Sequence, residues 1–143
     1  MKITLIVVGK LKSQFKEIDD FFQKRIKIYS PLEIVELKER NDLALETENI
    51  IKSIPSKSFV VALRETGKGL DSLAFARLLS EKLVSHGSVC FVIGGAYGFG
   101  DINENLTLSI APWTLPHQLA RINLLEQIYR GLSINSGSGY HHA

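Results

Sequence analysis

Short runs of apolar residues alternate with longer amphipathic stretches along the whole chain, and this alternation limits the possible folds more than any other feature. The runs contain many Val and Ile residues, as in "ITLIVVG" (3–9), which is typical of strands covered on both faces. Between the runs, apolar side chains recur at helical spacing, as in 14–28. Strands that alternate with helices predict an α/β fold with a mainly parallel sheet and helices on both of its faces.

The boundaries of the expected elements follow from the same patterns and from Pro and Gly. Asp71 or Ser72 is expected to cap the third helix, and Gly87 to end it. "TGKG" (66–69) is expected to be a turn after the third strand. No linker or repeat divides the chain, so we expect one domain over 1–143. The predicted strands are 3–9, 32–38, 58–65, 89–93 and 106–111, and the predicted helices are 14–28, 43–54, 71–87 and 116–134.

The composition excludes several classes of protein. The chain has 143 residues, enough to bury a core without disulfides, and its single cysteine, Cys90, is expected to be a small core residue. No stretch approaches the roughly 20 apolar residues of a membrane-spanning helix, and no signal-peptide cleavage site follows the N-terminus. We therefore expect a cytoplasmic protein. The net charge of +2 and the pI of about 8.7 permit a nucleic-acid partner but do not argue for one.

The glycines in "VIGGAYGFG" (92–100) indicate that another group, from the protein or from a ligand, comes close to the backbone there. Their spacing is not the G-x-G-x-x-G of a dinucleotide fold, and they follow the fourth strand rather than the first. No Gly-Lys-Ser/Thr follows, so they do not form a phosphate-binding P-loop. From the residues alone, a bound ligand and a helix packed against a turn are equally good explanations.

Three predicted strand ends carry unusual loops: 63–69, 94–100 and 110–115. Ligands of open α/β sheets lie beyond the carboxyl ends of the strands. If the three strands are neighbours, their loops form one pocket.

The start of the last predicted helix carries several candidate residues. Trp113, between two prolines, can stack on a ring or fill the core, and the core is its more frequent place. His117 and Arg121 are four residues apart and share a helix face, and so do Glu126 and Arg130, which are expected to be an exposed pair. His117 can act as a base, a phosphate contact or a structural histidine. The apolar surface of this helix is wide for contact with a sheet alone, so a dimer interface is plausible.

The chain ends in Tyr140, His141 and His142 after a plain "SGSG". This tail is either a disordered end or an aromatic and basic segment that contacts RNA. No set of Cys and His ligands accompanies the histidines, so we expect no metal site.

Several segments together resemble the RlmH family, and the resemblance spans nearly the whole chain. Members of that family are SPOUT-class enzymes that use S-adenosylmethionine to methylate N3 of a pseudouridine in 23S ribosomal RNA. The resemblance implies a sheet whose C-terminal part is threaded into a trefoil knot, and a homodimer with the knot region at its interface. The segments are "KITLIVVGKLK", "LRETGKGLDSLAFARLL", "FVIGGAYGFG", "LTLSIAPWTLPHQLARINLLEQIYRG" and the terminal "YHH".

The resemblance also implies roles for individual residues. His117 is the candidate base for the imide proton, with a carboxylate as the other option, and a bulky side chain at Gly94 is expected to block cofactor binding. Arg121 and Arg130 are expected to contact phosphates, and the Tyr140–His141 tail to close over the substrate. The cofactor is expected to be held largely by backbone groups at Leu63, Gly94, Ile110, Ala111, Pro112, Trp113, Thr114 and Leu115.

Two positions depart from the family pattern. Arg64 stands where many members have a carboxylate after the strand-ending leucine, and His142-Ala143 stands where a basic residue usually follows Tyr-His. Three alternatives remain open at this point. They are a SPOUT-like methyltransferase with another RNA target, a non-enzymatic module that binds RNA or the ribosome, and a nucleotide-binding protein that uses the glycine loop for phosphates.

Overall fold

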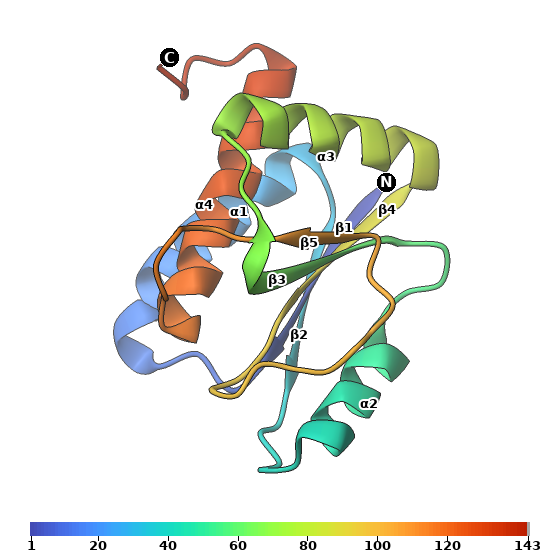
Figure 1. The fold of residues 1–143 in the computed structure, drawn as a ribbon. Coiled ribbons are helices and arrows are strands. Elements are labelled where there is room, and N and C mark those ends of the chain that lie inside the picture. Colours follow the sequence, from blue (N-terminus) through green and yellow to red (C-terminus); the bar gives the residue numbers. More distant parts are fainter. Residues whose placement is uncertain (143) are drawn as a thin grey trace.

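A five-stranded parallel sheet in the order β2-β1-β4-β3-β5 forms the centre of the molecule (Figure 1). The computed structural model describes residues 1–142, and Ala143, the end of the expected domain, lies outside them. The α/β class and the parallel sheet are therefore confirmed. The strands are β1 (Lys2–Val8), β2 (Leu32–Leu37), β3 (Phe59–Lys68), β4 (Ser88–Ile93) and β5 (Leu106–Leu108), and the helices are η1 (Ser13–Phe15), α1 (Lys16–Tyr29), α2 (Leu43–Ser53), α3 (Ser72–His86) and α4 (His117–Ser136).

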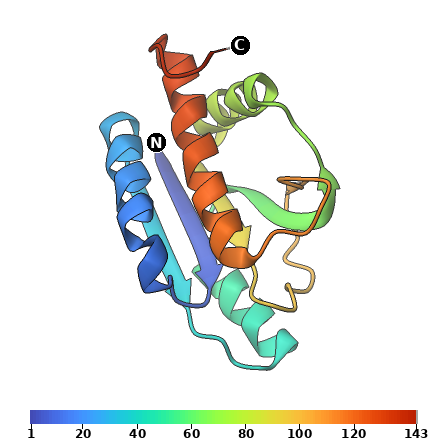
Figure 2. The same ribbon diagram turned by 90° about the vertical axis from the view of Figure 1, so that its left-hand side faces the viewer.

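Helices cover both faces of the sheet, as the alternation predicted. α1, α3 and α4 lie on one face, and α2 lies on the other (Figures 1 and 2). Alternate residues of each strand point to opposite faces, so the central strands supply two separate apolar clusters. On the α2 side, Phe99 and Ile102 from the segment after β4 complete the smaller cluster. The long apolar runs are thus buried on both sides.

α4 packs between α1 and α3, and this position explains its wide apolar surface. Leu125 and Ile128 are fully buried there, and Tyr129 packs against Phe22 of α1 and Tyr140 of the tail. The surface that suggested a dimer interface is therefore largely occupied within one chain. The homodimer and the knotted threading stay predictions.

The third strand is longer than the sequence indicated, and the turn expected at 66–69 is wrong. β3 pairs with Leu108 at Leu63 and again at Lys68, with an irregularity between the two positions. The Lys68 carbonyl also accepts a hydrogen bond from the Ser109 N–H at 2.9 Å. Gly67 permits this contact, because a Cβ there would lie 2.5 Å from the Leu108 carbonyl carbon. β5 ends at Leu108, not at residue 111, which leaves the following segment free to line a pocket.

The ends of α3 and the burial of Cys90 were predicted correctly, because these features depend on residues that are neighbours in sequence. Asp71 caps α3 by accepting from the Ala74 N–H at 2.7 Å, and Gly87 ends that helix with a left-handed φ of 74°. Cys90 is fully buried in β4, and burial raises the pKa of its thiol to about 12. No helix within residues 1–142 has the length and apolar character needed to cross a bilayer.

Candidate functional site

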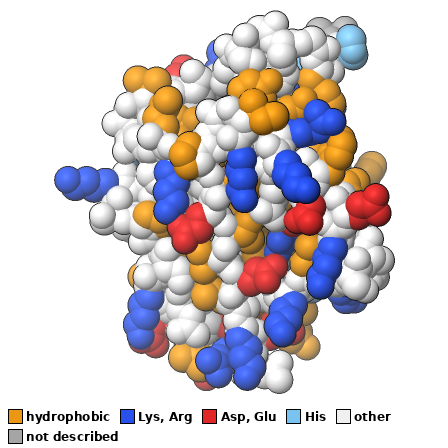
Figure 3. All heavy atoms as spheres, turned by 180° about the vertical axis from the view of Figure 1, so that it is seen from behind, with side chains coloured by type: hydrophobic (Ala, Val, Ile, Leu, Met, Phe, Trp, Pro, Cys, Tyr) orange, Lys and Arg blue, Asp and Glu red, His pale blue; other side chains and the backbone are white. Residues whose placement is uncertain are grey.

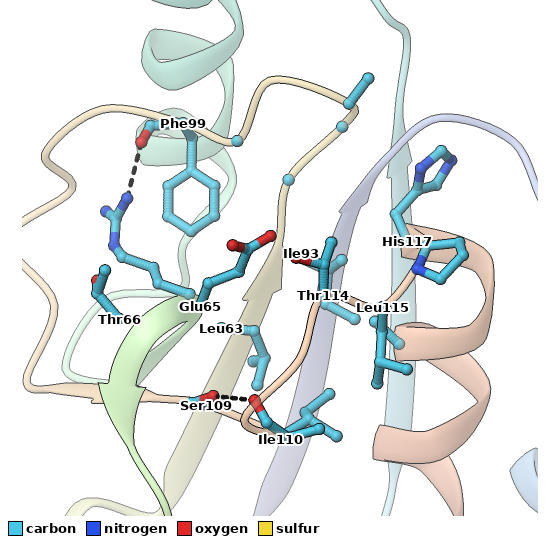
Figure 4. A pocket seen from close by; sticks show the side chains of 18 of the residues that line it. Leu63, Glu65, Thr66, Ile93, Phe99, Ser109, Ile110, Thr114, Leu115 and His117 are labelled. Carbon is cyan, nitrogen blue, oxygen red and sulfur yellow. Dashed lines mark hydrogen bonds between the residues drawn. The ribbon is translucent and has the colours of Figure 1, made fainter.

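A cavity of about 720 Å³ opens at the carboxyl ends of β3, β4 and β5 (Figure 4). These three strands are neighbours in the sheet, as the pocket prediction required. Its walls are residues 63–66, the glycine loop 93–99, residues 108–111 and 113–117, and Ala120. Such a volume is typical of pockets for small molecules and cofactors. The sequence correctly predicted that three distant loops would form one pocket.

Most of the residues expected at a cofactor site line this cavity, but Pro112 is not among its wall residues. Trp113 lines the cavity with 72% of its surface exposed, so the core position favoured from sequence is wrong. His117 also lines the cavity, as the first residue of α4. The expected cofactor residues found there are Leu63, Gly94, Ile110, Ala111, Trp113, Thr114 and Leu115.

Within the glycine loop, Gly94 lies close to the residues that follow the turn. A Cβ at Gly94 would lie 2.6 Å from the Phe99 ring and 2.9 Å from the Gly98 carbonyl carbon. Gly98 closes a four-residue turn by donating its N–H to the Gly95 carbonyl at 3.1 Å, with a φ of 73°. Gly94 therefore has no room for a side chain even before a ligand binds.

Arg64 holds the glycine loop against the end of β3. Its guanidinium donates to the carbonyls of Phe99 and Gly100, both at 2.7 Å, and to Glu104 at 2.8 Å, and it lies 4.1 Å from the centre of the Phe99 ring. Burial alone would raise the pKa of Glu104, but hydrogen bonds from Arg64 and Thr107 and the Arg64 charge outweigh it and hold that pKa below its ordinary value. Sequence reasoning noted Arg64 only as a departure from the family pattern and missed this role.

Two titratable side chains lie on different walls of the pocket. Figure 4 shows the Glu65 carboxylate extending from β3 into the pocket and His117 on the far side, at the start of α4. A carboxylate was the other option for the base, but nothing in the sequence singled out Glu65 for that role. The "LRE" at the strand end was the available signal, because successive strand residues alternate in direction and one of the two polar residues must face the pocket.

Gln118, the second residue of α4, fixes that wall of the pocket to the loop after β1. Its side-chain amide donates to the Lys10 carbonyl and its oxygen accepts from the Lys12 N–H, both at 2.9 Å. Gln118 is buried, and both of its hydrogen bonds are made to backbone. The start of α4, and with it His117, is therefore positioned by its contacts with the loop after β1.

Arg121 lies in the interior of the protein, away from solvent. It donates to both oxygens of Asp19 in α1, at 2.8 and 3.0 Å, and to Glu36 of β2 at 2.6 Å. Burial opposes its charge, but the two carboxylates outweigh that effect and raise the pKa of Arg121 further. A guanidinium enclosed in this way is not placed to contact phosphate, so its burial opposes the role expected from the resemblance.

The other expected RNA-contact residues gather at the far end of α4. Tyr140 donates to Glu126 at 3.0 Å, and the Arg130 guanidinium lies 4.8 Å from the centre of the Tyr140 ring and 3.0 Å from the His141 Nδ1. Glu126 and Arg130 are partly buried beneath the tail, so the expectation of an exposed pair is wrong. The tail contacts α4 at Glu126 and Arg130, nine and thirteen positions after His117, and none of its described residues lines the pocket.

The walls of the pocket offer unused backbone donors and apolar surface, which suit an adenosyl group. Among residues 1–142, no hydrogen bond uses the backbone N–H of Ala111, Trp113, Thr114 or Leu115, although all four line the cavity. Leu63, Ile93, Leu108 and Ile110 add apolar surface for a flat ring. No group of three metal-ligating side chains occurs within the described residues. The pocket therefore fits an organic cofactor held by backbone groups.

Comparison with known proteins agrees with this geometry. A family model described as "Predicted SPOUT methyltransferase" matches residues 1–141. The ribosomal RNA large subunit methyltransferase H of Clostridioides difficile is 39% identical to this chain, over 99% of both proteins. Proteins of the same name from Gemmatimonas aurantiaca and Metamycoplasma arthritidis are 37% and 34% identical, again over 99% of both chains.

Proposed function

We propose a specific reaction for this chain, which belongs to the SPOUT methyltransferase family: transfer of a methyl group from S-adenosylmethionine to N3 of a pseudouridine in 23S ribosomal RNA. The observation that carries the proposal is similarity over nearly the full length to relatives named ribosomal RNA large subunit methyltransferase H. The pocket at the ends of β3, β4 and β5 supports it independently, because its walls suit an adenosyl cofactor.

The cofactor would lie in this pocket, held largely by backbone groups of three segments. When bound, it supplies an electrophilic methyl group on a sulfonium, so the protein chiefly has to position two reactants. The free N–H groups of Ala111, Trp113, Thr114 and Leu115 would bind the edge of the adenine, and the apolar strand ends would cover its faces. Leu63, Gly94, Ile110, Ala111, Trp113, Thr114 and Leu115 are the proposed contacts, and Pro112 would act by holding the segment's course.

The nucleophile is an imide nitrogen, which must lose its proton before or during methyl transfer. His117 is the proposed acceptor, because it lies on the pocket wall and Gln118 fixes the helix turn that carries it. Glu65 is the other pocket side chain able to take a proton. A single substitution at each position separates the two roles.

The RNA partner and the homodimer follow from the family relationship. The expectations of a dimer and of a tail that contacts substrate are compatible when the tail of one copy meets the pocket of the other, because none of the described tail residues lines the pocket of its own chain. Arg130, Tyr140 and His141 are proposed RNA contacts of that kind. Arg121 is omitted, since both of its partners are carboxylates in the same chain.

Calorimetry tests the cofactor. S-adenosylmethionine and its demethylated product should bind the purified protein with one site per chain, and NAD should not. Absence of binding by both sulfur compounds at millimolar concentration would exclude the methyltransferase reaction. Binding of NAD instead would favour a nucleotide-binding protein.

Mass mapping of modified nucleosides tests the substrate. Ribosomal RNA from cells that lack this protein should lack one methylated pseudouridine in 23S RNA, and adding the protein with cofactor should restore it. A methyl group restored in another RNA would instead identify a SPOUT-like enzyme with a different target. Restoration with free RNA, large subunits or whole ribosomes would show which of these is the substrate.

His117→Ala should keep cofactor affinity within about twofold and lower turnover on ribosomal substrate by a factor of about 10²–10⁴, the usual contribution of general base catalysis. Glu65→Gln should lower turnover far less. The opposite pattern would transfer the base role to Glu65, and unchanged turnover in both variants would exclude general base catalysis by either residue.

A further inference from the structure

Two aromatic side chains at the pocket are unusually exposed. Tyr97 is 88% exposed and Trp113 is 72% exposed, and both lie on the pocket wall. The next most exposed aromatic side chain, Phe21, is 48% exposed, lies on α1 and contacts the Phe22 ring and the Arg25 guanidinium. Among residues 1–142, neither Tyr97 nor Trp113 takes part in a ring pair or a cation–π contact. Their rings therefore contribute little to the fold.

The backbone carries both rings at defined positions. Tyr97 is a central residue of the turn that the Gly98 N–H closes on the Gly95 carbonyl, and Arg64 holds the chain just beyond it. Trp113 follows Pro112, whose φ is fixed, and the Ala111 carbonyl just before accepts from the Ser109 hydroxyl at 2.8 Å. Burying a large ring stabilises a protein by about 1.5–3 kcal/mol. Tyr97 and Trp113 both stay exposed at one pocket and so do not contribute that stabilisation. Exposed apolar side chains that gather at one site are typical of residues that bind a partner.

The two rings stand on different walls of the pocket. Tyr97 belongs to the glycine loop and Trp113 to the segment after β5, and these segments border the cavity on separate sides (Figure 4). A planar group that enters the cavity lies between the segments that carry the two rings. Nucleobases are such groups, and unpaired RNA bases are recognised chiefly by stacking on aromatic side chains.

Positive charge lies close to the start of α4, the wall of the pocket that carries His117. Lys10 and Lys12 are exposed on the loop that Gln118 holds against the start of α4, beside His117. Neither lysine takes part in an ion pair within residues 1–142. On the face seen from behind, basic and acidic side chains are interspersed (Figure 3). Aromatic rings beside unpaired lysines are the combination that binds single-stranded nucleic acid.

We infer that Tyr97 and Trp113 are base-stacking contacts for unpaired RNA at the mouth of the pocket, one for the target nucleotide and one for a neighbouring base. The inference rests on the proposed function for the identity of the substrate. It is compatible with a cofactor contact at Trp113, because the backbone of that residue would face the cofactor while its exposed ring faces the substrate.

Trp113 is the only tryptophan of the chain, so the intrinsic fluorescence excited at 295 nm comes from this one ring. The protein is first saturated with S-adenosylhomocysteine and then titrated with a single-stranded uridine decamer. We expect little change with the cofactor product alone and marked quenching with RNA, together with protection from acrylamide. Full protection by the cofactor product alone, with no further change on adding RNA, would assign the ring to the cofactor and overturn the inference.

Substitutions give a second, independent readout. Tyr97→Ala and Trp113→Ala should each weaken RNA binding, and raise the KM for ribosomal substrate, by roughly 5- to 100-fold. Tyr97→Phe and Trp113→Phe should remain within about threefold of the wild type, because stacking needs a ring and not a hydroxyl or an indole N–H. Phe21→Ala, an exposed ring away from the pocket, is the matched control and should leave RNA affinity unchanged.

Two further measurements identify other occupants. Calorimetry with the cofactor product should give unchanged affinity in Tyr97→Ala, whose residue is not among the proposed cofactor contacts, and sedimentation of both alanine variants should give the same mass as the wild type. A shift to smaller mass would show that a second copy covers these rings. Unchanged RNA affinity in both variants would also overturn the inference. Failure of the wild type to bind the cofactor would instead count against the proposed function, since the decamer titration does not depend on turnover.

Discussion

The glycine loop and the start of α4 form two walls of the pocket, and the contacts that hold them differ in how deeply they are buried. The glycine loop is held by Arg64, whose side chain is 23% exposed and whose partners are two backbone carbonyls and Glu104. The wall that carries His117 is held from the protein interior, by Gln118 and by Arg121, whose side chain is only 6% exposed. The same guanidinium chemistry thus acts at the rim on one side and within the core on the other.

This difference indicates which wall can change shape without unfolding the protein. Arg121 joins α1, β2 and α4, so its contacts form only when the three elements are packed. Arg64 joins β3 to the glycine loop, in which Phe99 is the residue beyond β4 that belongs to an apolar core cluster. We expect substitutions at Arg121 to act mainly on stability and substitutions near Arg64 to act mainly on cofactor affinity.

The largest effect is expected from Arg121→Met. This variant leaves Asp19, which is 1% exposed, without its counter-charge, and losing one partner of a buried ion pair costs about 3–5 kcal/mol. Urea denaturation at neutral pH measures the loss. The double variant Asp19→Leu/Arg121→Met is the control, because removing both charges should recover much of the stability. A double variant as unstable as the single one would show that shape, not charge, dominates this contact.

Gly94→Ala should come next, with a loss of about 1–3 kcal/mol from overpacking. The new methyl group meets the Phe99 ring and the Gly98 backbone, so the glycine loop must shift. Cofactor affinity should fall as a result of that shift, which refines the expectation that a side chain would simply block the ligand. Gly69→Ala, where a Cβ has no neighbour within 4 Å, is the control and should be neutral. Thermal unfolding and calorimetry of both variants make the comparison.

Much of the fold could be predicted because its signals are local. The Val- and Ile-rich runs, the Asp71 cap and the left-handed Gly87 each depend on residues close in sequence. The turn expected at 66–69 failed because the second pairing of β3 with Leu108 involves a segment 40 residues away. Pairing between distant strands can override local turn residues.

The position of the pocket could be predicted from the sequence, but the contacts that shape it could not. Loops at neighbouring strand ends must meet, so the pocket followed from the order of elements. The contacts that shape it join residues far apart: Arg64 and Phe99 are separated by 35 positions, and Arg121 and Asp19 by 102. Trp113 was placed in the core because large rings usually lie there, and no local pattern marks one that stays exposed.

Arg64 offers the direct test of the difference between the walls. Arg64→Ala should weaken binding of the cofactor product about tenfold, corresponding to the net worth of one or two hydrogen bonds to a charged group, while stability falls by only about 1–2 kcal/mol. Arg64→Lys should rescue little, because an ammonium cannot donate to Phe99, Gly100 and Glu104 in the same fork geometry. Calorimetry and urea denaturation separate the two effects. An affinity loss no larger than that of Arg121→Met would contradict the distinction drawn between the walls.

The smallest effect concerns Glu104 and depends on pH. Because the folded protein holds the pKa of Glu104 below its ordinary value of 4.5, its contribution to stability is present above pH 4.5 and is lost as the pH falls through the lowered value. Glu104→Gln should therefore cost about 1 kcal/mol at pH 7, and the difference from the wild type should shrink below pH 4.5. Urea denaturation at a series of pH values measures it. In an Arg64→Ala background the same substitution should have little effect, since the charge that lowers this pKa is absent. A pH-dependent difference that persists there would assign the lowered pKa to Thr107 and the backbone, and would leave Arg64 holding the glycine loop through the two carbonyls alone.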